Sequence, residues 1–135
     1  MTREYITELT TAYPSIHEVW LFGSRTNGTE RPDSDWDYLV FDDDIRDMNH
    51  LCQTQRKRSD IDLLFVCADG DTVLSPWPEP DGSWKKLGLG DAPGGLNWRV
   101  VSDTEASYIQ TKERNPPEFA VDVSVMKAVR VYRRA

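Results

Sequence analysis

The sequence predicts a mixed α/β (α+β) fold, in which one sheet carries helices packed on one of its faces. Two observations indicate this class. In the first half, short apolar segments of strand length alternate with stretches of helical periodicity, and near the C-terminus valines alternate with mostly polar neighbours. With 135 residues, 39% of them hydrophobic, the chain has material for one core. We therefore expect residues 1–135 to form a single domain.

The first half contains the clearest elements, and residues 16–68 are expected to form the core region. Apolar residues at helical spacing end at Pro14, which stops the first helix. Asp44 is expected to cap the second helix, and the basic residues 56–58 suit the negative end of its dipole. The predicted order is helix 3–13, strand 16–22, strand 36–41, helix 44–55 and strand 60–67.

The second half is less regular. Residues 69–97 hold ten of the sixteen Gly and Pro residues, which predicts a long loop or a set of turns around a short strand near Trp84. Residues 98–135 are expected to form a strand, a helix and a final strand. The helix is expected because Ser102-Asp-Thr-Glu105 matches a capping box, and it would end before Pro116. The sheet would contain about five strands.

Composition and charge exclude several classes of protein. The net charge is −7, and the first 68 residues hold 13 acidic against 7 basic residues. An acidic chain repels a phosphate backbone, so we expect no binding to long nucleic acid. No apolar stretch approaches the roughly 20 residues of a membrane helix, and no apolar segment follows the charged N-terminus. Two cysteines are too few for a disulfide framework. We expect a cytoplasmic protein.

The segment between the first two predicted strands carries the chemistry. A strand ends at Gly23-Ser24, where a small residue lets backbone N–H groups approach a phosphate closely. Ten residues later come Asp35 and Asp37, which would share one face of a strand about 7 Å apart. Like charges on one face repel unless a cation lies between them, and Mg²⁺ also binds phosphate oxygens. This combination predicts a site for a nucleoside triphosphate.

A third carboxylate is expected on a neighbouring strand. Asp62, in the segment Asp60-Ile61-Asp62-Leu63, has the best position. Asp60 is two residues from Asp62 and would share its face of the strand, so it is an alternative near the start of that strand. Asp122 on the final strand is a weaker alternative for the third carboxylate. Five basic residues of the second half could reach a triphosphate, but for any single one of them we expect a solvated surface role. They are Lys85, Lys86, Lys112, Arg114 and Arg130.

The Gly23-Ser24 pair, the ten-residue gap and Asp35-Trp36-Asp37 resemble the nucleotidyltransferase superfamily of the DNA polymerase β type. Within it, the small minimal nucleotidyltransferases, often paired with a toxin partner, resemble this chain most. The resemblance covers residues 18–66 and implies a polymerase-β-like core and transfer of a nucleoside monophosphate. It also implies site residues: Gly23, Ser24 and the adjacent Arg25 for the nucleotide, with ATP favoured, and Asp35, Asp37 and Asp62 for catalysis and for two Mg²⁺ ions, or Mn²⁺.

Two functions follow from these observations. The first is an active transferase whose acceptor is a protein partner or a small molecule, since the acidic charge disfavours RNA. The second is a binding module that keeps the fold without catalysis and acts as an antitoxin or inhibitor of a protein partner. An intact cluster of like charges favours the enzyme, because binding alone does not require it.

Overall fold

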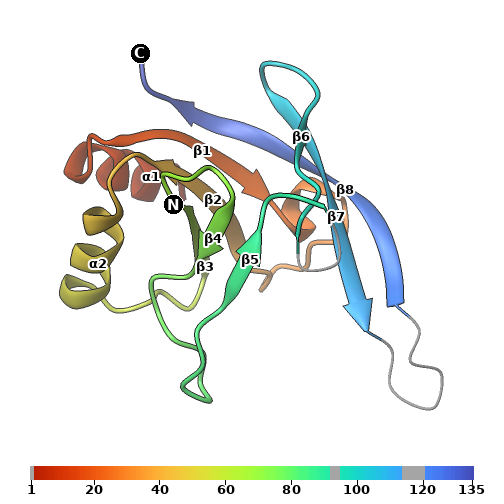
Figure 1. Ribbon diagram of the computed structural model, residues 1–135, viewed down its shortest axis with the longest axis horizontal. Helices are drawn as coiled ribbons and strands as arrows, with labels where there is room; N and C mark the ends of the chain where they lie inside the picture. Colours follow the sequence, from red (N-terminus) through yellow and green to blue (C-terminus); the bar gives the residue numbers. More distant parts are fainter. Residues whose placement is uncertain (1, 92–94, 114–120) are drawn as a thin grey trace.

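The computed structural model describes residues 2–91, 95–113 and 121–135, and in these ranges it contains two α-helices and one eight-stranded sheet (Figure 1). The strand order is β5-β4-β3-β2-β1-β8-β7-β6. The elements are α1 (Thr2–Ala12), β1 (Ile16–Phe22), the 3-10 helix η1 (Ser24–Thr26), β2 (Trp36–Asp42), α2 (Ile45–Thr54), β3 (Ile61–Val66), β4 (Thr72–Leu74), β5 (Lys86–Gly88), β6 (Arg99–Val100), β7 (Glu105–Glu113) and β8 (Val121–Arg133).

The elements predicted for the first half are confirmed, with ends that differ by no more than one residue. β2 and β3 are parallel, and α2 forms the crossover that a parallel pair requires. Asp44 caps α2 as expected, because its side chain accepts a hydrogen bond from the backbone N–H of Arg46 at 3.0 Å. The mixed class is thus confirmed. The sheet is larger than predicted because residues 69–97 contribute β4 and β5 and because β7 is a strand where a helix was expected.

Both helices pack against the same face of the central strands β1, β2 and β3. Figure 1 shows α1 and α2 together on the left of the molecule. This helix-covered face is apolar because alternate residues of each strand point toward the helices. Neither helix of the described ranges has the length and apolar character needed to cross a membrane. The buried residues of this layer are Tyr5, Ile6, Leu9, Tyr13, Ile16, Val19, Tyr38, Val40, Met48, Leu51, Ile61, Leu63 and Phe65.

The opposite face of β1, β2 and β3 carries a second core cluster, which the curled far end of the sheet covers. Ala106 and Tyr108 of β7 are buried together with Leu39 of β2 and Leu64 of β3. The ring of Trp98, which precedes β6, lies edge-on to Trp20 with centroids 5.3 Å apart. One face of the central strands is therefore covered by helices and the other by the strands of the second half. The carboxylates of the candidate site lie on this second face.

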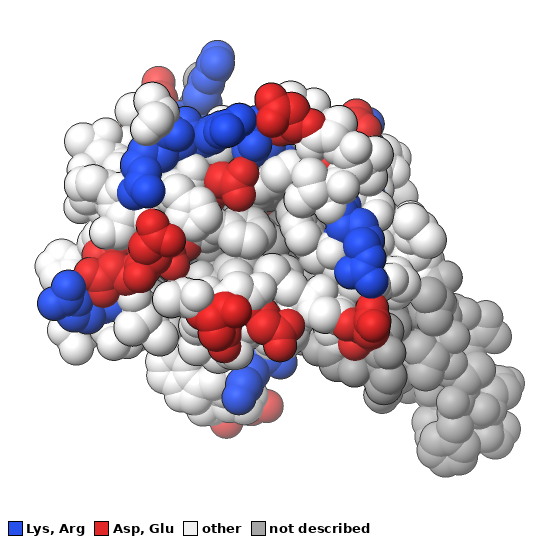
Figure 2. All heavy atoms as spheres, turned by 45° about the horizontal axis from the view of Figure 1, so that its top comes forward, with Lys and Arg blue, Asp and Glu red and all other residues white. Residues whose placement is uncertain are grey.

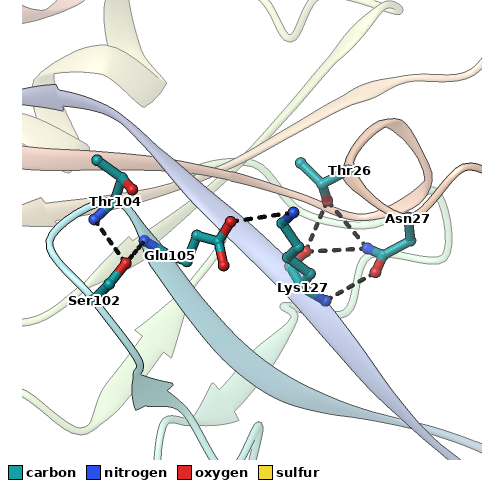
Figure 3. A network of polar contacts seen from close by, with 6 residues as sticks. All are labelled: Thr26, Asn27, Ser102, Thr104, Glu105 and Lys127. Carbon is teal, nitrogen blue, oxygen red and sulfur yellow. Dashed lines mark hydrogen bonds and ion pairs between the residues drawn. The ribbon is translucent and has the colours of Figure 1, made fainter.

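The helix expected after Ser102 is not present, and β7 takes its place. The Ser102 hydroxyl accepts hydrogen bonds from the N–H groups of Thr104 and Glu105 at 3.3 and 3.2 Å (Figure 3), as a capping residue would. Those bonds close a turn between β6 and β7 instead of opening a helix, and nine register pairs then join β7 to β8. The second half therefore ends as three strands, because long-range strand pairing overrides the local signal.

A pair of carboxyl groups, Asp42 and Asp47, lies where β2 leads into α2. Asp42 is only 5% exposed, and one of its oxygens accepts the N–H of Asp44 at 2.9 Å. Oδ2 of Asp42 and Oδ2 of Asp47 are buried and have no hydrogen-bond partner among the described residues unless the two groups share a proton. Burial and the hydrogen bond with the Asp47 side chain accordingly raise the pKa of Asp42 to about 7.

This pair predicts a pH-dependent stability. The folded protein holds a proton that the unfolded chain releases near pH 4, so its stability falls as the pH rises from about 4 to 7. Asp47→Asn supplies an amide N–H to Asp42, and we expect it to raise the free energy of unfolding at pH 8 by about 1 kcal/mol and by less at pH 4.5. Urea unfolding at both pH values measures the difference. An equal gain at the two pH values would contradict the shared proton.

Candidate functional site

The bend after β1 is built around Gly23. Its backbone has φ 81° and ψ −157°, a conformation that only glycine adopts without strain. A Cβ at this position would overlap Oδ2 of Asp37. The turn of η1 follows at once, held by hydrogen bonds from the N–H groups of Thr26 and Asn27 to the carbonyl oxygens of Gly23 and Ser24, both 3.2 Å long. Glycine is therefore required here because the backbone approaches a carboxylate.

The bend is fixed to the second half of the chain by η1. The Thr26 hydroxyl and the Asn27 side-chain amide donate to the carbonyl oxygen of Lys127 on β8, at 2.8 and 3.1 Å, and Oδ1 of Asn27 accepts the N–H of Lys127 at 2.8 Å (Figure 3). Nζ of Lys127 lies 3.2 Å from a carboxylate oxygen of Glu105 on β7. The Gly23 bend is thus held rigidly against the β7–β8 ribbon.

Asp37 and Asp62 lie side by side on neighbouring strands. They are register partners in the parallel pairing of β2 with β3. Both line a cavity of about 330 Å³ on the sheet face opposite the helices, together with Gly23 at its edge. This volume is at the lower end of the roughly 300–1,000 Å³ typical of small-molecule sites. The sequence predicted a same-face pair of Asp35 and Asp37 on one strand, whereas the structure brings Asp37 together with Asp62 across two strands.

The electrostatics of this site centre on Asp37. Burial, followed by the negative charges of Asp62 and Asp35, raises the pKa of Asp37 to about 6. The ammonium groups of Lys85 and Lys57 act in the opposite direction. The site therefore holds more negative than positive charge, and a bound cation would relieve the repulsion.

The other predicted carboxylates have different positions. Asp35 precedes the first residue of β2 and is exposed, although its charge still reaches Asp37. Asp60 is held by Arg58 through two hydrogen bonds of 3.0 and 2.7 Å, so it belongs to an ion pair. The side chain of Asp122 lies outside the described residues. Among the described candidates for the third carboxylate, Asp62 alone lines the cavity.

The two residues that follow Gly23 differ in their contacts. The Ser24 side chain is half-buried and makes no hydrogen bond with a described residue, so it stays a candidate for binding a nucleotide. Arg25 donates from Nε and Nη2 to the carbonyl oxygen of Ser34 at 3.3 and 2.8 Å, and its guanidinium lies 4.1 Å from the centre of the Trp36 ring. Arg25 therefore holds the loop before β2, and binding a nucleotide would require it to leave these contacts.

The cavity also contains residues that the sequence did not single out. The hydroxyl of Tyr108 on β7 accepts the N–H of Gly23 at 2.8 Å. Gln110 of the same strand is a further polar lining residue. Lys85, for which a solvated surface role was favoured over contact with a triphosphate, is exposed and also lines the cavity. The apolar wall consists of Phe22, Leu64, Leu87, Leu96 and Ile109.

The donor set fits a small divalent cation that keeps part of its water. Mg²⁺ is commonly held by one or two carboxylates together with substrate phosphates and water, and Asp37 and Asp62 supply that number. Within the described ranges, no group of three or more His, Cys, Asp or Glu side chains converges closely enough to enclose an ion. Asp37 and Asp62 could therefore supply part of the coordination of a cation, and a phosphate ligand would have to complete it.

The hydrogen bond between Tyr108 and Gly23 yields a prediction. Tyr108→Phe leaves a half-buried N–H unpaired, so we expect a loss of about 1 kcal/mol in unfolding free energy. It also frees that N–H for a phosphate oxygen, so the rise in melting temperature produced by Mg²⁺ and ATP should be larger than in the wild type. Tyr13→Phe is the control. The Tyr13 hydroxyl forms a hydrogen bond of 2.7 Å with Nδ1 of His50, on the helix-covered face and not in the cavity. An equal rise in both variants would contradict a phosphate seat at Gly23.

Comparison with known proteins gives one match, which covers the N-terminal part of the chain. A family model described as Polymerase beta, Nucleotidyltransferase matches residues 4–55. The matched segment runs from α1 through α2 and contains the Gly23 bend and Asp37, but it ends before Asp62. The resemblance of this segment to the polymerase beta-type nucleotidyltransferase superfamily is thereby confirmed. No match was found among curated proteins or among solved structures.

Proposed function

We propose that the protein is a metal-dependent nucleotidyltransferase that moves a nucleoside monophosphate from a nucleoside triphosphate to an acceptor hydroxyl. The acceptor oxygen forms a bond to the α-phosphorus, the bond from that phosphorus to the bridging oxygen breaks, and pyrophosphate leaves while the acceptor proton passes to a base. The observation that carries the proposal is the adjacency of Asp37 and Asp62 at a cavity bordered by the Gly23 bend.

Each site residue has a distinct role in this proposal. Asp37 and Asp62, assisted by Asp35, hold two Mg²⁺ ions, for which Mn²⁺ can substitute. When bound, such ions lower the pKa of the acceptor hydroxyl and neutralise charge on the attacking and leaving oxygens. Asp62 is in addition the candidate base. Gly23 and Ser24 contact the triphosphate, for which ATP is the favoured donor.

The surface charges support a protein or a small molecule as the acceptor. Acidic and basic groups lie next to each other on the face shown in Figure 2. Arg130 of β8 contacts carboxylate oxygens of Glu18 and Asp103, each at 3.1 Å, and Arg133 and Arg134 also form ion pairs. Because these cations are already paired, they offer little net attraction to a phosphate backbone. A long nucleic acid is accordingly not the acceptor that we propose.

The reaction is tested by following the two ends of the triphosphate separately. The protein is incubated with Mg²⁺, candidate partner proteins and ATP labelled at either the α- or the γ-phosphate. Nucleotidyl transfer attaches the α label to the acceptor and releases the γ label as pyrophosphate. Attachment of the γ label would identify a phosphotransferase instead and would contradict the proposal.

A second function, a binding module that inhibits a protein partner without catalysis, is favoured by two contacts. The N–H of Gly23 is already bonded to Tyr108, and Nζ of Lys57 lies 3.6 Å from Oδ1 of Asp62. In a nucleotide complex the N–H of Gly23 would bind a phosphate oxygen and Asp62 would bind a cation, so each group would have to leave its present partner. Asp37→Asn separates the two functions: a partner that stays inhibited by this variant supports the binding module, and one that is released supports the enzyme.

A further inference from the structure

Lys57, in the segment that joins α2 to β3, lies beside Asp62 of the carboxylate pair. Its Nζ is 3.6 Å from Oδ1 of Asp62, and about half of its side chain is exposed, against about a quarter of the Asp62 side chain. At this distance the two groups attract each other without the short hydrogen bonds of a tightly held pair. The ammonium group thus stands at the Asp62 side of the proposed cation seat.

The basic neighbours of Lys57 do not share this position. Arg58 is committed to Asp60, and its guanidinium lies 5.3 Å from the centre of the Tyr5 ring, on the side of the helices. Arg56 is exposed and forms no ion pair with a described residue. The basic run 56–58 follows the end of α2, whose last turn contains no basic residue, and within this run Lys57 is the member that contacts a carboxylate of the site.

We propose that Lys57 is a positioning residue with two positions: beside Asp62 in the free protein, and on the phosphates of the nucleotide once a divalent cation occupies that carboxylate. The inference rests on the proposed function, because it assumes a cation and a triphosphate in the same cavity. In the free protein the ammonium group of Lys57 then offsets part of the repulsion between Asp37 and Asp62, until the cation and the nucleotide bind.

The chemistry of lysine suits this exchange. A primary ammonium on a flexible stem is a compact point charge with three donors, and it can move between acceptors without a fixed orientation. A divalent cation that coordinates a carboxylate oxygen directly displaces a monovalent group held only at 3.6 Å. Lys85 lines the cavity, and its positive charge, like that of Lys57, acts on Asp37. The incoming phosphates would then meet two cations of the protein besides the metal.

The test measures binding and does not depend on turnover. Mn²⁺ is titrated alone into the wild type, Lys57→Gln and the adjacent control Arg56→Gln, which removes the same charge from an exposed position. We expect Lys57→Gln to bind Mn²⁺ about fivefold more tightly, because its competitor is gone. At saturating Mn²⁺, its affinity for α,β-methylene ATP should fall about fivefold. Arg56→Gln should change each affinity less than twofold.

Opposite changes in the two affinities, confined to Lys57→Gln, are the expected result. Equal changes in Lys57→Gln and Arg56→Gln would show a general charge effect and would overturn the inference, as would an unchanged Mn²⁺ affinity in Lys57→Gln. The proposed function fails separately, when the wild type binds Mn²⁺ but does not bind the ATP analogue. Lys57→Arg keeps the charge and should restore an affinity for Mn²⁺ close to that of the wild type.

Discussion

Asp37→Asn is expected to abolish nucleotidyl transfer and at the same time to stabilise the free protein. Loss of a group that only supports a metal ligand typically lowers metal affinity or activity by about 10- to 100-fold. Loss of a ligand itself should cost more, so we expect the rate of transfer to fall more than about 100-fold. Stability should rise because burial and two neighbouring carboxylates disfavour the charged form of Asp37, whose pKa is about 6. After allowance for partial exposure, we expect a gain of about 1–2 kcal/mol in unfolding free energy at pH 8.

The pH dependence and a control make this prediction specific. The carboxyl group of Asp37 is protonated in the fold below about pH 6 and in the unfolded chain below about pH 4, so the gain should disappear as the pH falls from about 6 to 4. Asp33→Asn removes the same charge from an exposed residue in the loop before β2 and should alter neither transfer nor stability appreciably. A destabilised Asp37→Asn would show that this carboxylate supports the fold instead of the chemistry.

Gly23→Ala is expected to have the largest effect on folding. Alanine at φ 81° and ψ −157° is strained by about 1–3 kcal/mol, and its Cβ would also overlap Oδ2 of Asp37. Either the bend opens or Asp37 moves away from Asp62, and both responses remove the site. We expect a loss of about 3 kcal/mol in unfolding free energy, and no binding of nucleotide by the fraction that folds.

Gly28→Ala is the matched control for this variant. Gly28 also has a positive φ, 72°, but a Cβ there would meet no atom within 4 Å. Its replacement should therefore cost only the backbone strain, about 1 kcal/mol, and leave nucleotide binding intact. In the double variant Gly23→Ala with Asp37→Ala, part of the loss should be recovered, because the overlapping carboxylate is gone. Additive effects would contradict the close approach of Gly23 to Asp37.

The sequence predicted the N-terminal half well because its signals are local. Helical spacing, Pro14 and the cap at Asp44 define α1 and α2 from neighbouring residues alone. The sequence also predicted that Asp62 lies on a strand that neighbours the strand of Asp37, but it did not predict the register of the two strands. That register is a long-range property, and the structure supplies it.

Other parts of the site could not be predicted for the same reason. Residues two apart share a face only inside a strand, and β2 begins at Trp36, so Asp35 falls just before the alternation starts. Tyr108 was placed on a helix because Ser102 and Glu105 resemble a cap, whereas pairing with β8, where Met126 is the register partner of Tyr108, makes that segment a strand. Arg25 follows the bend directly, but the turn of η1 directs it to the carbonyl of Ser34.

Metal-dependent binding of a nucleotide decides whether Asp37 and Asp62 form the seat that we propose. Isothermal titration with each of the four nucleoside triphosphates, with Mn²⁺ and then with EDTA, should be carried out on the wild type and on Asp37→Asn. We predict that the wild type binds at least one triphosphate only when Mn²⁺ is present, and that Asp37→Asn binds none. Binding that survives EDTA, or that is equal in Asp37→Asn, would contradict a cation seat at this carboxylate pair.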